Sequence, residues 1–193
     1  MNAKATRAEI VRVAREAFAA HGYVDVRLDA VARAAHATTG AIYHHFGGKA
    51  GLMMAVGEHV EREVVAAIGA RVPADGTPWE AIRAAALATL ELCSRPEVAR
   101  IIFKEAPNAL GAAAWREVEM RFGLGGLEAL FQRASSAGQL VPDDPVLVTR
   151  IFMAALVEAV ESMVEEPGPS RGCAARAVVE ELLGAFMRPS PTG

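Results

Sequence analysis

The sequence LDAVARAAHATTGAIYHHFGGK, at residues 28–49, is typical of two short helices joined by a tight turn. Apolar residues recur every three or four positions over 28–35, which predicts the first helix. The turn is expected at His36, and Thr38 can cap a second helix that runs to about His45. Two helices joined in this way form the helix-turn-helix unit, whose second helix enters the major groove of DNA.

The second helix has two different faces when its residues are placed at about 100° intervals. Ile42 and Phe46 lie together and are expected to anchor the helix to a small core. The other side holds the candidates for contact with the groove and with the phosphates beside it, namely Gly40, Ala41, Tyr43, His44 and His45. A missing side chain at Gly40 would let the backbone approach DNA closely.

Further phosphate contacts are expected around this helix. Thr38 and Thr39 lie at its N-terminus, where free N–H groups and the helix dipole favour an anion. Lys49 begins the next helix and can reach a phosphate. Arg27, just before the helix at residues 28–35, can also reach a phosphate, and Asp25 is a possible cap for that helix.

A plain helical protein is the alternative, because helix-turn-helix patterns also occur without DNA binding. A solvated helix face would then account for the tyrosine and histidines, but it explains poorly why four of the five histidines precede Lys49. Residues 1–51 contain seven Lys and Arg against four Asp and Glu, and the remainder contains thirteen against nineteen. This distribution is typical of a DNA-binding head on a body with another role.

The fold class is predicted as all-α, with about nine helices and no convincing strand alternation. We expect a three-helix head at residues 1–51, a larger helical body at 52–188 and a disordered tail at 189–193. Several residues mark expected helix boundaries. A capping box at Thr6 and Glu9 is expected to begin the helix of the N-terminus, and a second capping box at Thr77 and Glu80 the fifth helix. Asp144 is expected to open the eighth helix and Ser170 to cap the last, while the sixth is expected to end before Pro107.

The last two predicted helices have apolar faces that are broad for a body of this size. Two adjacent antiparallel helices of this kind can pair with their copies in a four-helix bundle, which predicts a homodimer. The residues expected at the interface are Phe152, Ala155, Leu156, Ala159, Met163, Val179, Leu182, Leu183 and Phe186. The alternative is that these faces complete the core of one chain. Two heads about one DNA turn apart would read a pseudo-palindrome.

Other function classes find little support in the sequence. It has no nucleophile–base pair, metal-ligand set or phosphate loop, so we expect neither an enzyme nor a cofactor or metal. It lacks a signal segment and a membrane span, and Cys93 and Cys173 are expected as small core residues of a cytoplasmic protein. A helical protein-interaction module without DNA activity remains the alternative function, and a helical enzyme a less favoured one.

The N-terminal quarter resembles the TetR (tetracycline repressor) family of transcriptional regulators. The residues that carry the resemblance, in order, are Ile10, Ala14, Ala17, Phe18, Gly22, Tyr23, Val31, Ala32, Ala35, Thr38, Gly40, Ile42, Tyr43, His45, Phe46, Lys49 and Leu52. The chain departs from the family pattern at His36, where the family usually has Gly, and at Arg27, where it usually has Thr or Ser.

The resemblance implies a homodimeric regulator, most simply a repressor that leaves a pseudo-palindromic operator when a small molecule binds. In the family, the fifth to seventh helices enclose a mostly apolar ligand cavity, and binding moves the heads through the fourth helix. The corresponding residues here suggest a lipophilic effector, and the candidate lining consists of Leu87, Leu90, Phe103, Trp115, Met120 and Phe122. For any one of these residues, an ordinary core position is the competing interpretation.

Overall fold

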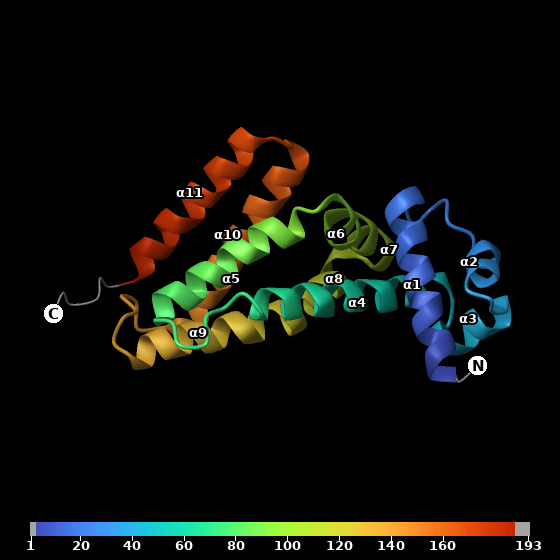
Figure 1. The fold of residues 1–193 in the computed structure, drawn as a ribbon, viewed down its shortest axis with the longest axis horizontal. Coiled ribbons are helices and arrows are strands. Elements are labelled where there is room, and N and C mark those ends of the chain that lie inside the picture. The colour runs from blue at the N-terminus through green and yellow to red at the C-terminus, as the bar shows by residue number, and fades with distance from the viewer. Residues whose placement is uncertain (1–2, 188–193) are drawn as a thin grey trace. The chain divides into compact units, whose positions relative to one another are not determined.

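A computed structural model describes residues 3–187, and in these residues the chain is all-α, as predicted. Its one non-helical pairing is an isolated β-bridge between Leu140 and Met187. Figure 1 follows the helices along the chain. Their bounds are α1 Ala3–His21, α2 Leu28–Ala34, α3 Thr39–Phe46, α4 Lys49–Gly69, α5 Pro78–Cys93, α6 Pro96–Ala99, α7 Ala106–Leu110, α8 Ala112–Glu119, α9 Gly125–Ser136, α10 Pro145–Glu165 and α11 Pro169–Phe186.

Two pairs of these helices are each joined into one continuous helical segment by a π-helical turn. The turn η1 (Arg100–Glu105) joins α6 to α7, and the turn η2 (Met120–Leu124) joins α8 to α9. Counted as continuous segments, the described residues therefore form nine helices, which agrees with the expected number.

The sixth helix does not end before Pro107, so that prediction was wrong. Pro107 lies in the first turn of α7, directly after η1. The N–H of Ala106 donates to the carbonyl of Ile101, five residues back, so the ordinary α-helical ladder is already interrupted at this point. The missing N–H of Pro107 therefore falls where the α-helical ladder is already interrupted.

Helices α5 and α10 begin at the side-chain caps that the sequence predicts. Thr77 and Glu80 form the predicted capping box of α5, and the side chain of Asp144 accepts a hydrogen bond from the N–H of Leu147 at the start of α10. Two expectations were wrong. Helix α1 already begins at Ala3, ahead of the expected cap at Thr6, and α11 begins at Pro169 rather than after Ser170.

The chain divides into two compact units. The first comprises residues 1–62 and 96–118, and the second comprises 63–95 and 119–193. The division expected at residue 51 follows the sequence pattern, whereas in the structure 96–118 pack with the N-terminal helices. The expected disordered tail at 189–193 lies outside the described residues.

The first unit is built around large apolar side chains from α1, α3 and α4. Phe18, Ile10, Ile42 and Leu52 are fully buried. These residues come from the apolar stripes that the sequence shows at helical spacing, so the head forms its own core. α2 packs against both α1 and α3 and completes this group.

Trp115 on α8 is also buried in the first unit, where its ring lies against the backbone of Gly57 in α4. A Cβ atom at Gly57 would lie 2.5 Å from the indole ring, which is too close for any side chain. The glycine is therefore required by this helix contact.

The second unit is held together by α5, α9, α10 and α11. Helix α10 packs against α5, α9 and α11, and α5 packs against α9 and α11. The rings of Phe131 and Phe152 meet edge to face with centroids 5.5 Å apart. Leu156 on α10 and Leu183 on α11 are fully buried in this core.

The cysteines were expected as small core residues, and this holds for Cys93 only. Cys93 is buried near the end of α5, whereas Cys173 is exposed on α11. Among the described helices, none has the length and hydropathy needed to cross a membrane.

Candidate nucleic-acid interface

Both ends of α3 are fixed by local hydrogen bonds. The side chain of Thr38 accepts a hydrogen bond from the N–H of Ala41 at 3.1 Å, so Thr38 is the N-cap that the sequence predicts. At the other end Gly47 adopts a left-handed φ of 74° and its N–H donates to the carbonyl of Tyr43. These two residues define an eight-residue helix between them.

The inner face of α3 rests on the head's core through Ile42, which has no exposed surface. Phe46, the second expected anchor, is only half-buried, and the guanidinium of Arg7 lies 5.1 Å above its ring. The predicted orientation of the helix is therefore confirmed, with Ile42 as its main anchor.

The outer face of α3 is open to solvent. Tyr43 is 57% exposed, and His44 and Gly40 are also exposed, while His45 and Ala41 are half-buried. The rings of His44 and His45 lie edge to face, 5.2 Å apart. Along one helix this surface offers ring N–H groups, a phenol and a short bare stretch of backbone, all of which can contact base edges and phosphates.

Gly40, like Gly69, Gly125 and Gly126, is a helical glycine that no close contact within the described chain requires. A Cβ atom at Gly40 would meet only the Thr38 hydroxyl, at an ordinary 3.7 Å. At Gly51, by contrast, a Cβ atom would lie 1.7 Å from the carbonyl oxygen of Phe46. A glycine in a helix costs about 1 kcal/mol relative to alanine. The absent side chain leaves the backbone of α3 uncovered at this position.

The turn between α2 and α3 takes the conformation that the sequence predicts. His36 has φ of 50°, in the left-handed region where the family usually has glycine. Its N–H donates to the carbonyl of Arg33 at 3.2 Å, and the N–H of Ala37 donates to that of Ala32 at 2.8 Å. The departure from the family pattern therefore leaves the turn in the left-handed geometry.

Arg27 occupies the N-cap position of α2, and no side chain, including that of Asp25, caps this helix through a hydrogen bond. The guanidinium of Arg27 instead donates to Asp29, with Nε 3.0 Å from Oδ1, and this hydrogen bond lowers the pKa of the Asp29 carboxyl. Arg27 is exposed. It can therefore reach a phosphate only by leaving or sharing this carboxylate.

Lys49 is tied into the head at its ammonium group. Its Nζ donates to the backbone carbonyl of Val24 at 2.9 Å and lies 4.8 Å from the centre of the Tyr23 ring. An ammonium has three donors, so this bond leaves donors for a phosphate. Lys49 also fixes the start of α4 to the turn that follows α1.

Several basic residues of the head have carboxylate partners. Arg12 pairs with both Glu9 and Glu16, and Arg15 pairs with Glu97. The hydrogen bond from Arg12 lowers the pKa of Glu9. These exposed pairs contribute little to stability, and their carboxylates offset part of the positive charge of the head.

The six residues expected to line a ligand cavity divide between the two units. Phe103 and Trp115 lie in the first unit, and Leu87, Leu90, Met120 and Phe122 lie in the second. Trp115 and Leu90 are buried, Met120 is exposed, and the other three are half-buried. The indole N–H of Trp115 is buried and has no hydrogen-bond partner in the described part of the chain. A buried donor without a partner is costly, so Trp115 is the residue of this set whose side chain most needs a hydrogen-bond acceptor.

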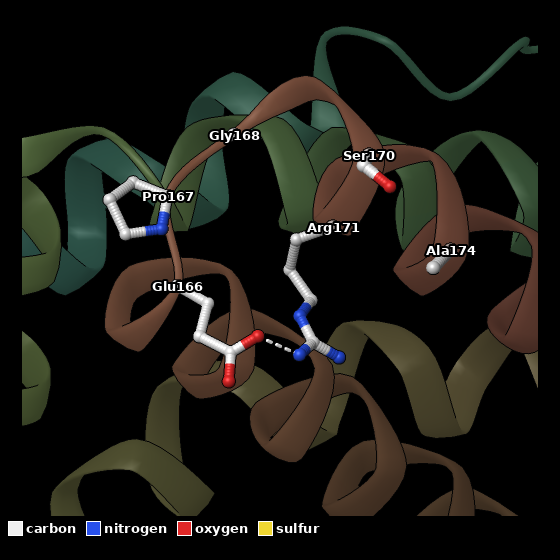
Figure 2. Close-up of a pocket in the computed structure, with 6 residues that line it drawn as sticks. All are labelled: Glu166, Pro167, Gly168, Ser170, Arg171 and Ala174. Atoms are coloured by element: carbon white, nitrogen blue, oxygen red, sulfur yellow. Dashed lines mark hydrogen bonds and ion pairs between the residues drawn. The ribbon is translucent and has the colours of Figure 1, made fainter.

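The structure also shows an open pocket elsewhere, at the turn from α10 to α11 (Figure 2). It has a volume of about 490 Å³, and an ion pair between Glu166 and Arg171 crosses it. The pocket is open to solvent and is lined by exposed or half-buried residues, none of which was expected in the ligand site. We assign it no binding role.

The residues expected at the dimer interface fall into two groups. Four of them, Phe152, Leu156, Val179 and Leu183, are buried within one chain and have almost no surface to offer a second copy. The other five are half-buried: Ala155, Ala159, Met163, Leu182 and Phe186. The large apolar residues that α10 and α11 do expose are Val146, Leu147, Ile151, Val164 and Val178. The four buried residues thus complete the core of one chain, and a dimer interface on these helices stays a prediction.

Two functional candidates were missed in the sequence. Arg100 and Glu105 of η1 contact the end of α1, and Glu105 is only 7% exposed. The signal available was a glutamate two residues after the apolar run IIF at residues 101–103. In the described residues, no group of three or more His, Cys, Asp and Glu side chains is placed to hold a metal ion.

Two family models match the chain. Residues 10–56 match that of bacterial regulatory proteins of the tetR family, and residues 79–186 match the tetracyclin repressor-like C-terminal domain. The uncharacterized HTH-type transcriptional regulator TtgW of Pseudomonas putida is 48% identical over 54 residues, which are 28% of this chain and 40% of TtgW. The match therefore spans less than half of that relative.

Solved structures match over nearly the whole chain. A TetR-family transcriptional regulator from Pectobacterium atrosepticum is 30% identical, with a TM-score of 0.84, and the alignment covers 97% of this chain and 96% of that one. The protein of the SmeT–triclosan complex has a TM-score of 0.72 at 20% identity, with coverages of 96% and 93%. The second match, at that identity, concerns the fold alone.

Proposed function

This chain belongs to the TetR family, whose members are DNA-binding transcription regulators rather than enzymes, and we propose that it acts as a homodimeric repressor. In this proposal two copies bind a pseudo-palindromic operator, and a small lipophilic molecule that binds the helical body releases them. The protein would act in the cytoplasm. The observation that carries the DNA-binding part is the exposed face of α3, which is fixed at both ends and anchored by Ile42.

The contacts that we propose for this face follow from its chemistry. His44 and Gly40 face the groove with Ala41 beside them, and Tyr43 and His45 reach toward the phosphates. Phosphate contacts are also proposed for Thr38 and Thr39 at the helix N-terminus, together with Lys49 and Arg27. This arrangement is supported by hydrogen-bond donors at the start of α3 and just after its end, and by the uncovered backbone of α3 at Gly40.

The exposed apolar residues of α10 and α11 support the proposed dimer. Leu147 and Ile151 are one helical turn apart on α10 and are 53% and 47% exposed, and Val178 on α11 is 64% exposed. Exposed apolar side chains on two packed helices are typical of a surface that a partner covers. A second copy brings two reading helices to one operator.

The proposed effector is small and lipophilic, because the candidate residues around it are mainly apolar and aromatic. The buried indole N–H of Trp115 supports a polar acceptor on that molecule. The triclosan complex of SmeT, a protein of the same fold, offers an apolar aromatic compound as a first probe. Thermal unfolding of the parent and of Trp115→Phe in the presence of triclosan tests this part of the proposal. Stabilisation of the parent that is weaker in Trp115→Phe is expected, whereas no stabilisation of the parent counts against such an effector.

Selection from a random library of double-stranded DNA tests the central part of the proposal. The purified protein should enrich a pseudo-palindrome with half-sites about one helical turn apart. Its affinity for that sequence should fall steeply as salt rises, because phosphate contacts release counterions. If the folded protein enriches no motif even at low salt, the alternative of a helical protein-interaction module is favoured instead.

A further inference from the structure

The carboxyl end of α1 is capped by a side chain that lies about eighty residues away in sequence. Nη1 of Arg100 donates to the carbonyl of Ala19 at 2.9 Å and to that of Ala20 at 3.0 Å. Both carbonyls belong to the last turn of α1, where a helix has no partners of its own for these groups. A cation at this position also suits the negative end of the helix dipole.

Glu105 binds the turn that follows this helix end. Its Oε2 accepts a hydrogen bond from the backbone N–H of Tyr23 at 2.7 Å, and its Oε1 lies 3.2 Å from Nε of Arg100. A buried carboxylate is stable only when its oxygens have such partners. The Arg100–Glu105 pair and the turn at Tyr23 therefore depend on each other.

Gly22 lets the turn approach this pair. Its φ of 83° is in the left-handed region, and a Cβ atom there would lie 3.0 Å from Oε1 of Glu105 and 3.1 Å from Nη2 of Arg100. Backbone conformation and close contact thus both select glycine. The turn lies directly against the Arg100–Glu105 pair.

The π-helical turn η1 is what brings Arg100 and Glu105 together. Residues five apart are separated by about 140° around an α-helix, at 100° per residue. In a π-helix, where each bond spans five residues, positions i and i+5 lie closer to the same face. If residues 100–105 returned to α-helical winding, Arg100 and Glu105 would point in more different directions.

The turn at Tyr23 is also held by Lys49, the first residue of α4. Lys49 donates to the carbonyl of Val24 and lies over the ring of Tyr23, and it comes three residues after Phe46 ends α3. Tyr23 therefore receives a backbone contact from Glu105 and a ring contact from Lys49. Through this residue η1 is connected to both flanks of the helix-turn-helix.

We infer that Arg100 and Glu105 are positioning residues for DNA binding, which hold the helices of the head to residues 96–118 of the same unit by capping α1 while residues 100–105 form a π-helix. The inference rests on the proposed function, since it needs two heads on one operator. In that dimer the heads are joined only through the rest of their chains. A head that loses this cap should still bind its half-site, but it should accept a wider range of half-site spacings.

The test measures affinity for three duplexes that carry the selected motif. One has two half-sites at the preferred spacing, one has two half-sites moved apart by a few base pairs, and one has a single half-site. The variants are Glu105→Gln, which keeps the shape of the side chain and an acceptor for Tyr23, and Glu105→Ala. Glu97→Gln is the matched control, since it removes the same charge from a carboxylate that is 61% exposed and pairs with Arg15. Thermal unfolding verifies that each variant is folded.

The parent is expected to prefer the native spacing by about tenfold, the usual scale of coupling between two sites. Both Glu105 variants should lose most of this preference while binding the single half-site as the parent does, and Glu97→Gln should keep it. A lower overall stability alone would weaken binding to all three duplexes alike. If Glu105→Ala does not fold, Glu105→Gln decides the question.

Two outcomes overturn the inference, and they differ in what else they overturn. If the parent prefers one spacing and Glu105→Gln prefers it equally, the positioning role is wrong and the proposed function stands. If the parent binds no duplex with two half-sites better than a single half-site, the proposed dimeric repressor fails together with the inference.

Discussion

The outer faces of α3 and of α10 are both open to solvent, but they differ in chemistry. α3 exposes polar groups, among them Tyr43 and His44, whereas α10 exposes Leu147 and Ile151. Polar groups are well solvated while they have no partner, so a surface like that of α3 suits a partner that binds and leaves. Exposed apolar side chains gain from being covered permanently. The difference is consistent with DNA at α3 and a second copy of the chain at α10.

The largest effect is expected from a charge placed on the apolar surface of α10. Ile151→Glu should raise the dissociation constant of the dimer about thirtyfold or more, because a central interface residue contributes 2 kcal/mol or more. Operator affinity should fall with it. Analytical ultracentrifugation measures the dimer directly. Val141→Glu is the matched control, because Val141 is similarly exposed, at 50%, but lies before α10 begins. Equal dimer stability in the two variants would argue against this interface.

A smaller effect is expected from His44→Ala on the polar surface of α3. The variant should lose about 1–3 kcal/mol of operator affinity and should accept other bases at one position of each half-site, since a base contact carries sequence information. The fold should be unaffected because His44 is exposed. Lys49→Ala is the counterpart, and it should weaken binding to all duplexes roughly equally. Selections with both variants separate the two cases, and unchanged motifs and affinities would refute the contact assignment.

Gly40→Ala is expected to act in opposite directions on stability and on binding. Alanine should stabilise α3 by about 0.5–1 kcal/mol, because nothing in the described chain contacts the added Cβ atom closely. It should weaken operator binding, because the methyl group keeps DNA from the helix backbone. Urea unfolding and DNA titration of the same preparation measure both quantities. A variant that is more stable and binds the operator as tightly as the parent would show that DNA does not approach this backbone.

The smallest effect is expected away from both surfaces, at the capping box of α5. The N–H of Thr77 lowers the pKa of Glu80 below its ordinary value of 4.5. The stability that this bond contributes is present above that value and is lost as the pH falls through the lowered pKa. Glu80→Gln should therefore unfold with a shallower dependence on acid pH than the parent. Its operator affinity and dimer constant at neutral pH should match those of the parent. An unchanged acid dependence would show that Glu80 is not the group responsible.

The sequence was most informative where structure is set by neighbours along the chain. The cap at Thr38, the turn at His36 and the buried position of Ile42 all depend on residues within one or two helical turns, and all are confirmed. The exposed face of α3 follows from the same periodicity. For these reasons the candidate DNA surface was predictable residue by residue.

The body was less predictable, because helical periodicity does not tell which of two apolar arcs faces the chain's own core. On α10, Phe152 and Leu156 face inward and Ile151 faces outward, although all three are apolar. The contacts of Arg100 and Glu105 with the end of α1 could not be predicted from local sequence, since they depend on a π-helical turn and on a contact with Tyr23 across about eighty residues. Long-range packing determines both features.

Hydroxyl-radical footprinting of the selected duplex tests the central claim most directly, because it shows how many heads lie on the DNA and how far apart they are. The parent should protect two segments on one face of the duplex, with centres about one helical turn apart. At the same protein concentration, Ile151→Glu should lose this paired protection. A single protected segment for the parent, or a footprint that Ile151→Glu reproduces in full, would contradict a dimer that reads DNA with two copies of α3.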